Sequence, residues 1–285
     1  MKKISLIIVT YNSSKHIYDC LDSIFSYNDI GDSLEVVIVD NASSEQEQMF
    51  DGIKGKYGER VILKDSGKNG GYGYGNNVGI KIATAPIVIV MNPDVRMIQP
   101  IFKDILLQME DGTIGVMGVS FIDGSLPFYV KIEKVNFWNQ IIHPLRIKLK
   151  CYNERKMYMS GSFLVFKKKA FEDAGMFDEN IFMYTEEPDI TNRIQKIGYH
   201  AVWCPQLQVK HLAHGRGFNR RTEDMMTQSL KYYAVKYNMD LAYNIRVKIR
   251  ILRKKRVVAR ILNDKFKLEL FDQRLDYLMQ LLSTL

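Results

Sequence analysis

Short apolar runs that alternate with helical patterns constrain the fold of this chain more than any other feature. In the first third of the sequence, runs rich in isoleucine and valine lie at residues 4–9, 35–40, 60–64 and 87–91. Apolar residues at helical spacing follow the first two runs, and a glycine-rich turn with a helix near 76–84 precedes the fourth. Strands that alternate with helices predict an α/β fold with a mostly parallel central sheet flanked by helices on both faces.

The pattern is less regular after residue 97 and changes again near residue 222. Between these points we expect further strands and helices, with an irregular stretch at 125–156. From residue 222 the periodicity is helical almost to the end. We therefore predict one α/β domain over residues 1–221 and a C-terminal helical extension over residues 222–285.

Composition is typical of a globular protein that acts in the cytosol. The chain has 285 residues, of which 46% are hydrophobic and 25% charged, so it can bury a substantial core. Its three cysteines, Cys20, Cys151 and Cys204, are far apart and predict reduced thiols, not disulfides or a zinc site. The apolar run near the start is shorter than that of a signal peptide, and no stretch reaches the ~20 apolar residues of a membrane span. We expect a cytosolic protein.

Polar residues and glycines follow the four predicted strands at the points where the strands end. Each group alone is typical of an ordinary turn. Because the carboxyl ends of parallel strands meet at one edge of a sheet, we expect all of these residues to line one rim, where such sheets bind ligands. They are Thr10, Tyr11, Asn12, Asp40, Asn41, the glycine-rich loop at 69–77, Asn92 and Asp94.

The glycine-rich loop does not fit the common nucleotide-binding motifs. Gly71, Gly73 and Asn76 break the dinucleotide pattern G-x-G-x-x-G, and the loop does not follow the first strand. The turn after the first strand, TYNSS, contains no glycine, and no Gly-Lys-Ser/Thr follows a glycine loop. A NAD-type site and a P-loop are therefore disfavoured.

Asp94 follows the buried run at 87–91 and stands behind Pro93, which blocks further ladder hydrogen bonds. A carboxylate in that place suits Mg²⁺ or Mn²⁺, because these hard ions prefer oxygen ligands and share them among carboxylates, phosphates and water. The sequence Asn92-Pro93-Asp94 is also an ordinary turn. Spacing alone leaves both interpretations open.

Acidic residues gather at the start of a helix predicted after residue 186. Pro188 suits the first helical position, which places Glu186 and Glu187 at the helix N-terminus. Unpaired amides and the helix dipole there favour the ionised form that a general base needs. The same pattern also describes an acidic first turn of a surface helix, in which Asp189 and Arg193 form an i,i+4 pair.

Two histidines, His211 and His214, follow the last predicted strand with a spacing of three. Histidines at this spacing bind metals in some proteins, but a histidine beside glycine in a loop more often makes hydrogen bonds at the surface. The spacing does not decide between the two.

Taken in chain order, these motifs resemble the family 2 glycosyltransferases, an inverting group with the GT-A nucleotide-sugar-binding fold. The resemblance covers roughly residues 3–215. It implies a catalytic domain with a nucleotide-binding half at 1–97 and an acceptor half at 98–221. The motifs are SLIIVTYNSSKHIYDCLDSI, VVIVDNASS, NGGYGYGNNVGI, VMNPDV, MSGSFLVFKKKAFEDAGMFDENIFMYTEEPDI and VKH.

The resemblance also implies a role for each motif. Asp94 would bind a Mg²⁺ or Mn²⁺ that bridges the donor diphosphate, with His211 as a further ligand. Glu186 or Glu187 would be the base that deprotonates the acceptor hydroxyl. The acceptor side would comprise Ser160, Gly161 and Asp189. The nucleotide-sugar would contact Thr10, Tyr11, Asn12, Asp40, Asn41, Gly71, Asn76 and Asn92.

Two departures from the family pattern leave details open. The acidic pair is Glu186-Glu187 followed by Pro188, where the family has Glu-Asp, so the sequence does not say which carboxylate is the base. After His211 the family often has a serine where this chain has Arg216, which bears on how the diphosphate is held.

The function implied is transfer of a sugar from a nucleotide-diphosphate donor to a glycan or polyprenyl-linked acceptor in bacterial surface polysaccharide synthesis. Asn-Pro-Asp is common among the rhamnosyltransferase-like members, which favours dTDP-rhamnose over a UDP-sugar. Two alternatives stay open: a nucleotidyltransferase, which TYNSS disfavours, and an inactive nucleotide-sugar-binding or membrane-associated partner protein. We expect no nucleic-acid partner, and self-association is left open.

The C-terminal region carries the excess of positive charge. The formal net charge is +8, and between Arg246 and Arg260 there are eight Lys or Arg and no acidic residue. These alternate with Ile, Leu and Val, which suits a helix that lies on an anionic membrane or one that packs on the domain with a solvated basic face. A lipid-linked acceptor favours peripheral contact through residues 246–267 with the inner face of the cell membrane.

Overall fold

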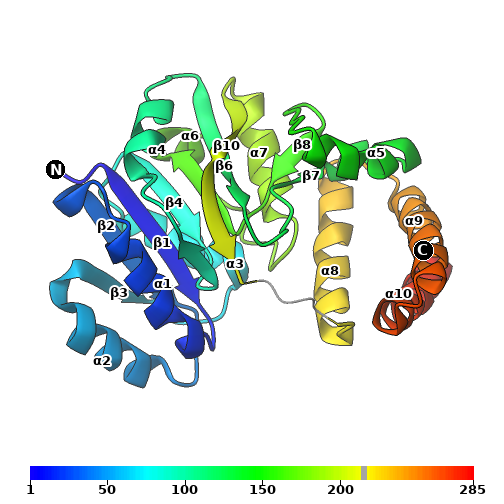
Figure 1. The fold of residues 1–285 in the computed structure, drawn as a ribbon, viewed down its shortest axis with the longest axis horizontal. Coiled ribbons are helices and arrows are strands. Elements are labelled where there is room, and N and C mark those ends of the chain that lie inside the picture. The colour runs from blue at the N-terminus through cyan, green and yellow to red at the C-terminus, as the bar shows by residue number, and fades with distance from the viewer. Residues whose placement is uncertain (213–216) are drawn as a thin grey trace. The chain divides into compact units, whose positions relative to one another are not determined.

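The computed structural model describes residues 1–212 and 217–285 (Figure 1). By packing, the described chain divides into two compact units, one of residues 1–129 and 158–212 and the other of residues 130–157 and 217–285. Residues 130–157 thus belong with the C-terminal helices. The domain boundary at residue 221 stays a prediction.

The first unit is built on an eight-stranded sheet, and a separate pair of strands is formed by β7 (Phe128–Val130) and β8 (Met157–Met159). The strands of the large sheet are β1 (Ile4–Thr10), β2 (Leu34–Asp40), β3 (Val61–Asp65), β4 (Ile87–Met91), β5 (Val95–Met97), β6 (Ile114–Phe121), β9 (Phe163–Lys167) and β10 (His200–His211). Their order is β3-β2-β1-β4-β9-β6-β10-β5. The first four are parallel, β9 is antiparallel to both neighbours, β6 and β10 are parallel, and β5 is antiparallel to β10. The predicted mostly parallel sheet is confirmed.

Helices cover both faces of this sheet (Figure 1). One face packs against α1 (Ser14–Ser26), α2 (Gln46–Tyr57) and α4 (Phe102–Met109), whose apolar stripes share a cluster with alternate residues of the central strands, such as Ile8 and Ile38. The other face carries α3 (Gly71–Ile82), which lies on Ile7 and Val39. Successive strand residues point to opposite faces, so the two layers are separated by the sheet. The remaining elements of the unit are η1 (Gly31–Ser33), η2 (Gly58–Arg60), α6 (Lys168–Asp173) and α7 (Glu186–Lys196).

The glycine-rich segment is helical from Gly71, so the expectation of a turn with a helix only near 76–84 was wrong. Glycine is a poor helix former, but here it permits close packing. A Cβ on Gly79 would lie 2.4 Å from Ile7 of β1 and 3.0 Å from Val39 of β2. Gly71 has φ +88°, and a Cβ there would lie 2.1 Å from the Phe182 carbonyl oxygen. Tertiary packing therefore overrides the local propensity.

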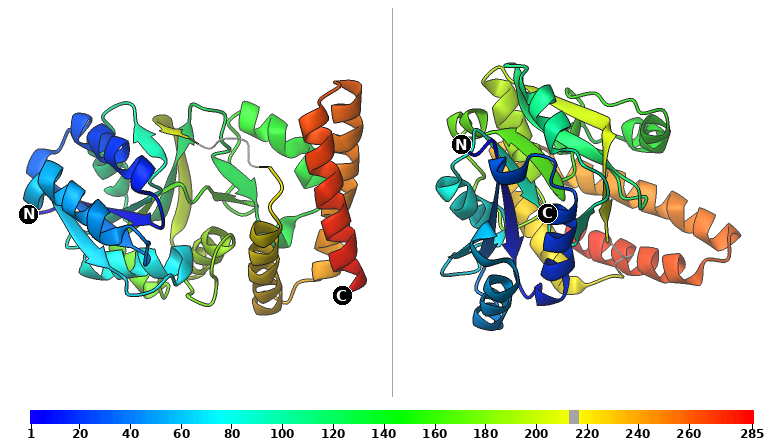
Figure 2. Two further views of the ribbon diagram at one scale, coloured as in Figure 1. Left: turned by 90° about the horizontal axis from the view of Figure 1, so that it is seen from below. Right: turned by 60° about the vertical axis from the view of Figure 1, so that its left-hand side comes forward.

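The second unit contains η3 (Ile132–Lys134), α5 (Phe137–Lys148), α8 (Arg220–Lys236), α9 (Leu241–Ile261) and α10 (Lys265–Ser283). The predicted C-terminal helical extension is confirmed, but the irregular stretch expected at 125–156 includes α5. This helix contains Pro144, and its N-cap is Asn136, whose side chain accepts a hydrogen bond from the Asn139 N–H. Helices α9 and α10 run antiparallel as a hairpin (Figure 2). None of the described helices combines the length and apolar character needed to span a bilayer.

Candidate active site

Asp40 ties together two loops at the carboxyl edge of the parallel strands. It lies opposite Thr10 in the register of β1 and β2 and is fully buried. Its carboxylate accepts hydrogen bonds from the Thr10 hydroxyl at 2.9 Å and from the Ser43 backbone N–H at 2.7 Å. Between the same two loops, the side chain of Asn12, a residue with φ +50°, accepts a hydrogen bond from the Ser44 N–H at 3.2 Å. The two strand-end loops are thereby fixed to each other.

Asn41 joins this rim to α3. Its side-chain amide donates a hydrogen bond to the Gly71 carbonyl at 2.9 Å. Asn76, which is buried, donates to the carbonyl of Tyr72 one turn earlier in the same helix, also at 2.9 Å. Tyr11, in contrast, is 49% exposed at the rim. The structure therefore gathers the predicted nucleotide-sugar residues of the first three strand ends along one edge of the sheet.

The antiparallel pairing of β4 with β9 places the end of β4 beside the segment that precedes β9. The Asn92 N–H donates a hydrogen bond to the Ser162 carbonyl at 3.0 Å. The neighbouring Gly161 N–H donates to Oε1 of Glu187 at 3.2 Å. A Cβ on Gly161 would lie 2.3 Å from that oxygen, so a larger residue does not fit without moving the carboxylate. This pairing brings the end of β4 together with the acidic start of α7.

Tyr72 links α3 to the same segment and was not predicted. Its hydroxyl donates a hydrogen bond to the Gly161 carbonyl at 2.7 Å, and its N–H donates to the Phe182 carbonyl at 3.0 Å. Burial raises its pKa well above the usual value, and the charges of Glu187 and Glu186 act in the same direction, so Tyr72 is a neutral donor. A tyrosine within a glycine-rich segment was its only signal in the sequence.

Glu186 and Glu187 lie in the first turn of α7, as predicted, but in different surroundings. Glu186 is 2% exposed, and burial raises its pKa well above the usual value, with a further contribution from the charge of Glu187. Glu187 is partly exposed; burial raises its pKa too, against hydrogen bonds from its own N–H and from the Gly161 N–H. Burial thus outweighs the amides of the helix start for both carboxyls, which differs from the expectation that the helix N-terminus favours their ionised form.

Two predicted acceptor-side residues have partners inside the protein. Asp189 is fully buried and forms an ion pair with Arg193 at 2.7 Å, and the Arg193 guanidinium also donates to the Ala174 carbonyl. Ser160 is buried, with its hydroxyl 3.4 Å from that of Ser162. The arrangement gives Asp189 a structural contact, and acceptor binding by these residues stays a prediction.

Asp94 and His211 meet because β5 pairs antiparallel with β10. His211 lies opposite Val95 in this register, and the Leu212 N–H donates a hydrogen bond to the Asp94 carbonyl at 2.8 Å. Nε2 of His211 lies 3.4 Å from Oδ1 of Asp94, with the two side chains 11% and 20% exposed. The chain thus brings a carboxylate and an imidazole to one point at the end of the sheet.

Asp123 and Ser125 orient this imidazole, and neither was predicted from the sequence. The Ser125 hydroxyl lies 3.2 Å from Nδ1 of His211 and donates a hydrogen bond to Asp123. The Asp123 carboxylate also accepts a hydrogen bond from the backbone N–H of His211 at 3.2 Å. With Nδ1 engaged, Nε2 faces Asp94, which is how outer partners orient histidine ligands at metal sites.

The donor atoms at Asp94 and His211 fit a divalent cation that takes its other ligands from phosphate and water. In residues 1–212 and 217–285 no group of three His, Cys, Asp or Glu is placed to hold a metal. Mg²⁺ and Mn²⁺ are commonly bound through one or two protein side chains together with substrate phosphates. His214 and Arg216, which the sequence also singled out, lie outside the described residues.

Comparison with known families decides the affiliation. The family described as "Glycosyl transferase family 2" matches residues 5–175, which is more than half of the chain. The chain belongs to glycosyl transferase family 2.

Among curated relatives, this family 2 chain is 41% identical over 61 residues to N-acetylglucosaminyl-diphospho-decaprenol L-rhamnosyltransferase of Mycobacterium tuberculosis, a match of 21% of the chain and 20% of that protein. It is 24% identical over 221 residues to low-salt glycan biosynthesis hexosyltransferase Agl10 of Haloferax volcanii, covering 73% of the chain and 66% of that protein. The chain thus spans about a fifth of the first relative and about two thirds of the second.

A solved structure shows the fold of this family 2 chain. Mannosyltransferase PcManGT from Pyrobaculum calidifontis, in complex with GDP-Man and Mn²⁺, superposes with a TM-score of 0.60 at 20% identity. The match covers 87% of this chain and 64% of that one. The GT-A fold that the sequence motifs implied is thereby confirmed.

Proposed function

We propose that this family 2 chain is an inverting, metal-dependent glycosyltransferase that moves a sugar from a nucleotide-diphosphate donor to a glycan or lipid-linked glycan. The strongest support is the meeting, at the end of β4, of two groups with complementary chemistry. Asn92 pairs with the segment that holds Glu187, and two residues further on Asp94 faces His211. A single displacement at an anomeric carbon needs a carboxylate that takes the acceptor proton and a cation site that stabilises the leaving diphosphate.

On the donor side, Asp94 and His211 would hold Mg²⁺ or Mn²⁺. When bound, this ion supplies positive charge against the negative charge that grows on the leaving diphosphate. The two strand-end loops that Asp40 joins by hydrogen bonds would present Tyr11 and the surrounding backbone to the nucleotide. Asn41 would fix the start of α3 next to the sugar. Asn-Pro-Asp and the mycobacterial relative, named as an L-rhamnosyltransferase, support dTDP-rhamnose as the first donor to test, with UDP-sugars next.

On the acceptor side, Glu187 would be the base. It is partly exposed, and the Gly161 N–H donates a hydrogen bond to its Oε1 at 3.2 Å. A pKa raised by burial brings a carboxylate nearer to neutral pH, which suits proton transfer from a hydroxyl during attack. Glu186, which is buried beside it, would stay out of contact with the acceptor. The names of both relatives, one for a diphospho-decaprenol substrate and one for glycan synthesis, support a lipid-linked or glycan acceptor.

The donor assignment is tested with purified protein, Mn²⁺ or Mg²⁺ and a panel of nucleotide-sugars. We expect one donor to raise the unfolding temperature in the presence of metal and to release its nucleoside diphosphate. Asp94→Asn should lose the metal-dependent part of this shift, whereas Asp32→Asn, exposed in η1 at the opposite end of β2, should keep it. If no donor changes either signal and Asp94→Asn behaves like wild type, the proposal is wrong.

The base is assigned by comparing Glu187→Gln with Glu186→Gln, which change neither size nor shape appreciably. Loss of a general base lowers the turnover rate by about 10²–10⁴-fold. We expect this loss in Glu187→Gln, with donor binding retained, and a far smaller effect in Glu186→Gln. The reverse order would assign the role to Glu186, and full activity in both would remove the base from α7.

A further inference from the structure

The junction between α9 and α10 exposes apolar side chains at high density. We call residues 253–267 the hairpin tip; it comprises the last turns of α9, the connecting turn and the start of α10. More than half of the surface of each of five apolar side chains in this segment is accessible to solvent. They are Val257 (58%), Val258 (53%), Ile261 (76%), Leu262 (70%) and Phe266 (58%).

The other end of the same hairpin is packed, so exposure at the tip is not a general property of these helices. Ile245 and Ile249 of α9 and Leu275 of α10 are at most 6% exposed and form a small core. Both views in Figure 2 show the two helices side by side along their length. Between the helices, apolar side chains are buried by contact between α9 and α10, whereas the apolar side chains of the tip lie outside this contact and are exposed.

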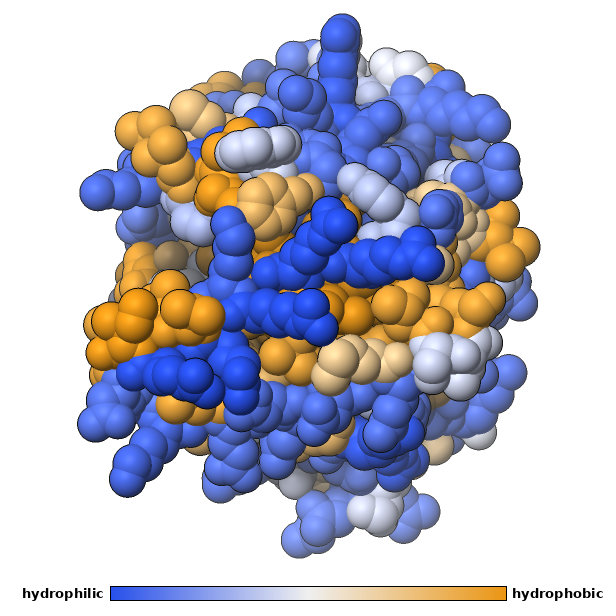
Figure 3. Space-filling view, turned by 90° about the vertical axis from the view of Figure 1, so that its right-hand side faces the viewer, coloured by the Kyte–Doolittle hydropathy of each residue, from blue (hydrophilic) through white to orange (hydrophobic). Residues whose placement is uncertain are grey.

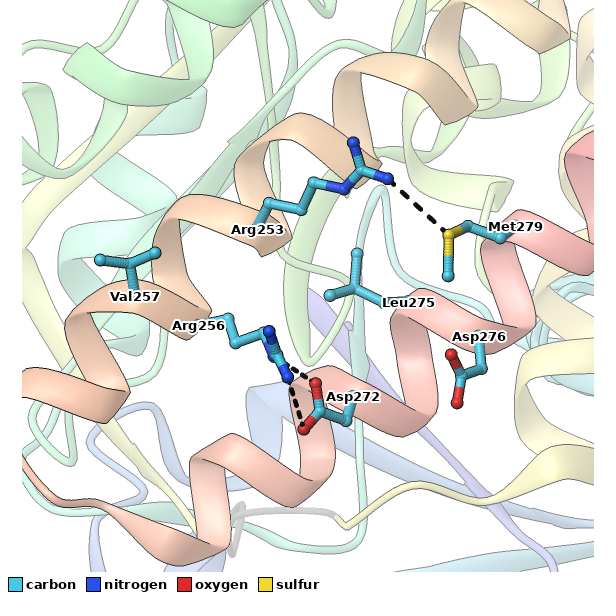
Figure 4. Close-up of a pocket in the computed structure, with 7 residues that line it drawn as sticks. All are labelled: Arg253, Arg256, Val257, Asp272, Leu275, Asp276 and Met279. Atoms are coloured by element: carbon cyan, nitrogen blue, oxygen red, sulfur yellow. Dashed lines mark hydrogen bonds and ion pairs between the residues drawn. The ribbon is translucent and has the colours of Figure 1, made fainter.

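Side chains across the seam hold the tip in place. Figure 4 shows Arg256 of α9 paired with Asp272 of α10, and the Arg253 guanidinium 3.8 Å from the Met279 sulfur. Asp264 caps α10 by accepting a hydrogen bond from the Lys267 N–H at 3.0 Å. The apolar residues are therefore presented on a braced turn.

The tip is also strongly basic. It contains seven Lys or Arg and one acidic residue, Asp264, which pairs with Lys267 at 2.7 Å. Lys255, Arg260 and Lys265 are exposed beside the apolar side chains. Figure 3 shows strongly hydrophilic side chains lying across a hydrophobic band on the face over α9 and α10. An occupant of this surface must be apolar at its centre and negative around it.

We propose that the hairpin tip docks on an anionic lipid surface, with its apolar side chains among the acyl chains and its basic side chains on the headgroup phosphates. Apolar burial and attraction to anionic lipid are the two forces that hold interfacial segments on membranes. A second copy of the chain is disfavoured, because it would bring the same positive charges face to face. The proposal deepens the proposed function, on which its biological sense rests: a lipid-linked acceptor is found at such a surface.

The test is sedimentation of the full chain with vesicles of phosphatidylcholine alone or with 30% phosphatidylglycerol added. These vesicles contain neither a sugar donor nor a sugar acceptor. Failure of binding here is thus independent of failure to bind a nucleotide-sugar. We expect binding to the anionic vesicles that weakens with salt. The triple change Ile261→Ser, Leu262→Ser and Phe266→Ser should lower the partition coefficient at least about tenfold. The change Lys255→Gln, Arg260→Gln and Lys265→Gln should lower it on the order of a hundredfold.

Two matched control variants remove exposed apolar or exposed basic side chains outside the hairpin tip. One changes exposed apolar residues to serine at Leu107, Leu149 and Val235, and the other changes exposed lysines to glutamine at Lys54, Lys81 and Lys103. Both should bind like wild type. Phe266→Trp, which keeps the tip apolar, adds a fluorescent reporter whose emission should shift to the blue on anionic vesicles, and it serves if the triple variant does not fold.

Three results would overturn the proposal. They are absence of wild-type binding to either vesicle, unchanged binding by the apolar triple variant, and no emission shift in Phe266→Trp. A lipid-free dimer that the apolar triple variant dissociates, measured by sedimentation velocity, would assign the tip to a second copy of the chain instead.

Discussion

Replacing Gly161 with alanine tests whether the start of α7 is placed for catalysis. The added Cβ would lie 2.3 Å from Oε1 and 2.8 Å from Cγ of Glu187. Ordinary contact begins at 3.4 Å, so the carboxylate must retreat by about 1 Å or adopt another rotamer. The φ angle of Gly161 lies outside the left-handed region, so the substitution acts through this contact and not through a left-handed backbone.

The expected effect is large on turnover and small on donor binding. A misplacement of about 1 Å costs about 10²-fold in rate, because reacting atoms must be aligned before the proton moves. Overpacking costs about 1–3 kcal/mol of stability. Turnover and KM are measured at 25 °C with the donor found by screening, donor affinity by titration, and folding by thermal unfolding in the same buffer.

Gly55→Ala is the matched control, since a Cβ at Gly55 in α2 meets nothing within 4 Å. It should keep full turnover and gain up to about 1 kcal/mol of stability, as replacement of a helical glycine does. Wild-type turnover in Gly161→Ala would refute the idea that this contact positions Glu187. A proportional loss of donor affinity would place the lesion on the nucleotide side.

Further outcomes follow from the same geometry. Relative to wild type, Glu186→Gln should gain stability as pH rises above about 4.5. Below that pH the Glu186 carboxyl is protonated in both the native and the unfolded wild-type chain. Above it the unfolded chain loses its proton first, because burial raises the native pKa, and wild type is thereby destabilised while the glutamine variant is not. Unfolding temperatures of variant and wild type at pH 4 and 7.5 measure this, and a constant difference contradicts it. The acid limb of kcat/KM should rise with pH through a pKa above 4.5, set by burial of Glu187, and should vanish in Glu187→Gln. Tyr72→Phe removes the 2.7 Å hydrogen bond to the Gly161 carbonyl and should cost about 1–3 kcal/mol of stability, measured by denaturant unfolding. The comparison is Tyr74→Phe, which removes a hydrogen bond to the Ser66 carbonyl, outside this segment.

Much of the fold was predictable, because its signals are local. A short run of β-branched residues favours a buried strand, and strands that alternate with helices favour a parallel sheet with helices on both faces. The prediction was wrong where local signals oppose the packing. The glycines of α3 are poor helix formers whose role is close contact with β1 and β2, and α5 contains Pro144, a residue that disfavours a helix interior.

In the candidate site, too, some residues were predictable from the sequence and others were not. Asp94 and the Glu186-Glu187 pair are visible in the sequence, since they stand at a strand end and at a helix start. Tyr72, Asp123 and Ser125 are not, because their partners are distant in the chain and no spacing rule connects them. The different surroundings of Glu186 and Glu187 are likewise invisible to composition.

The sequence by itself determined the first four strands, the C-terminal helical region, the polar strand ends and the basic character of the last third of the chain. All of these depend on neighbours within a few residues, through backbone geometry, periodicity and turn chemistry. Only the tertiary structure decided that His211 faces Asp94, that Gly161 holds Glu187, and which end of the α9–α10 hairpin keeps its apolar residues in solvent. Register between distant strands and burial of individual atoms are properties of the packed chain, since they depend on which surfaces exclude water from one another.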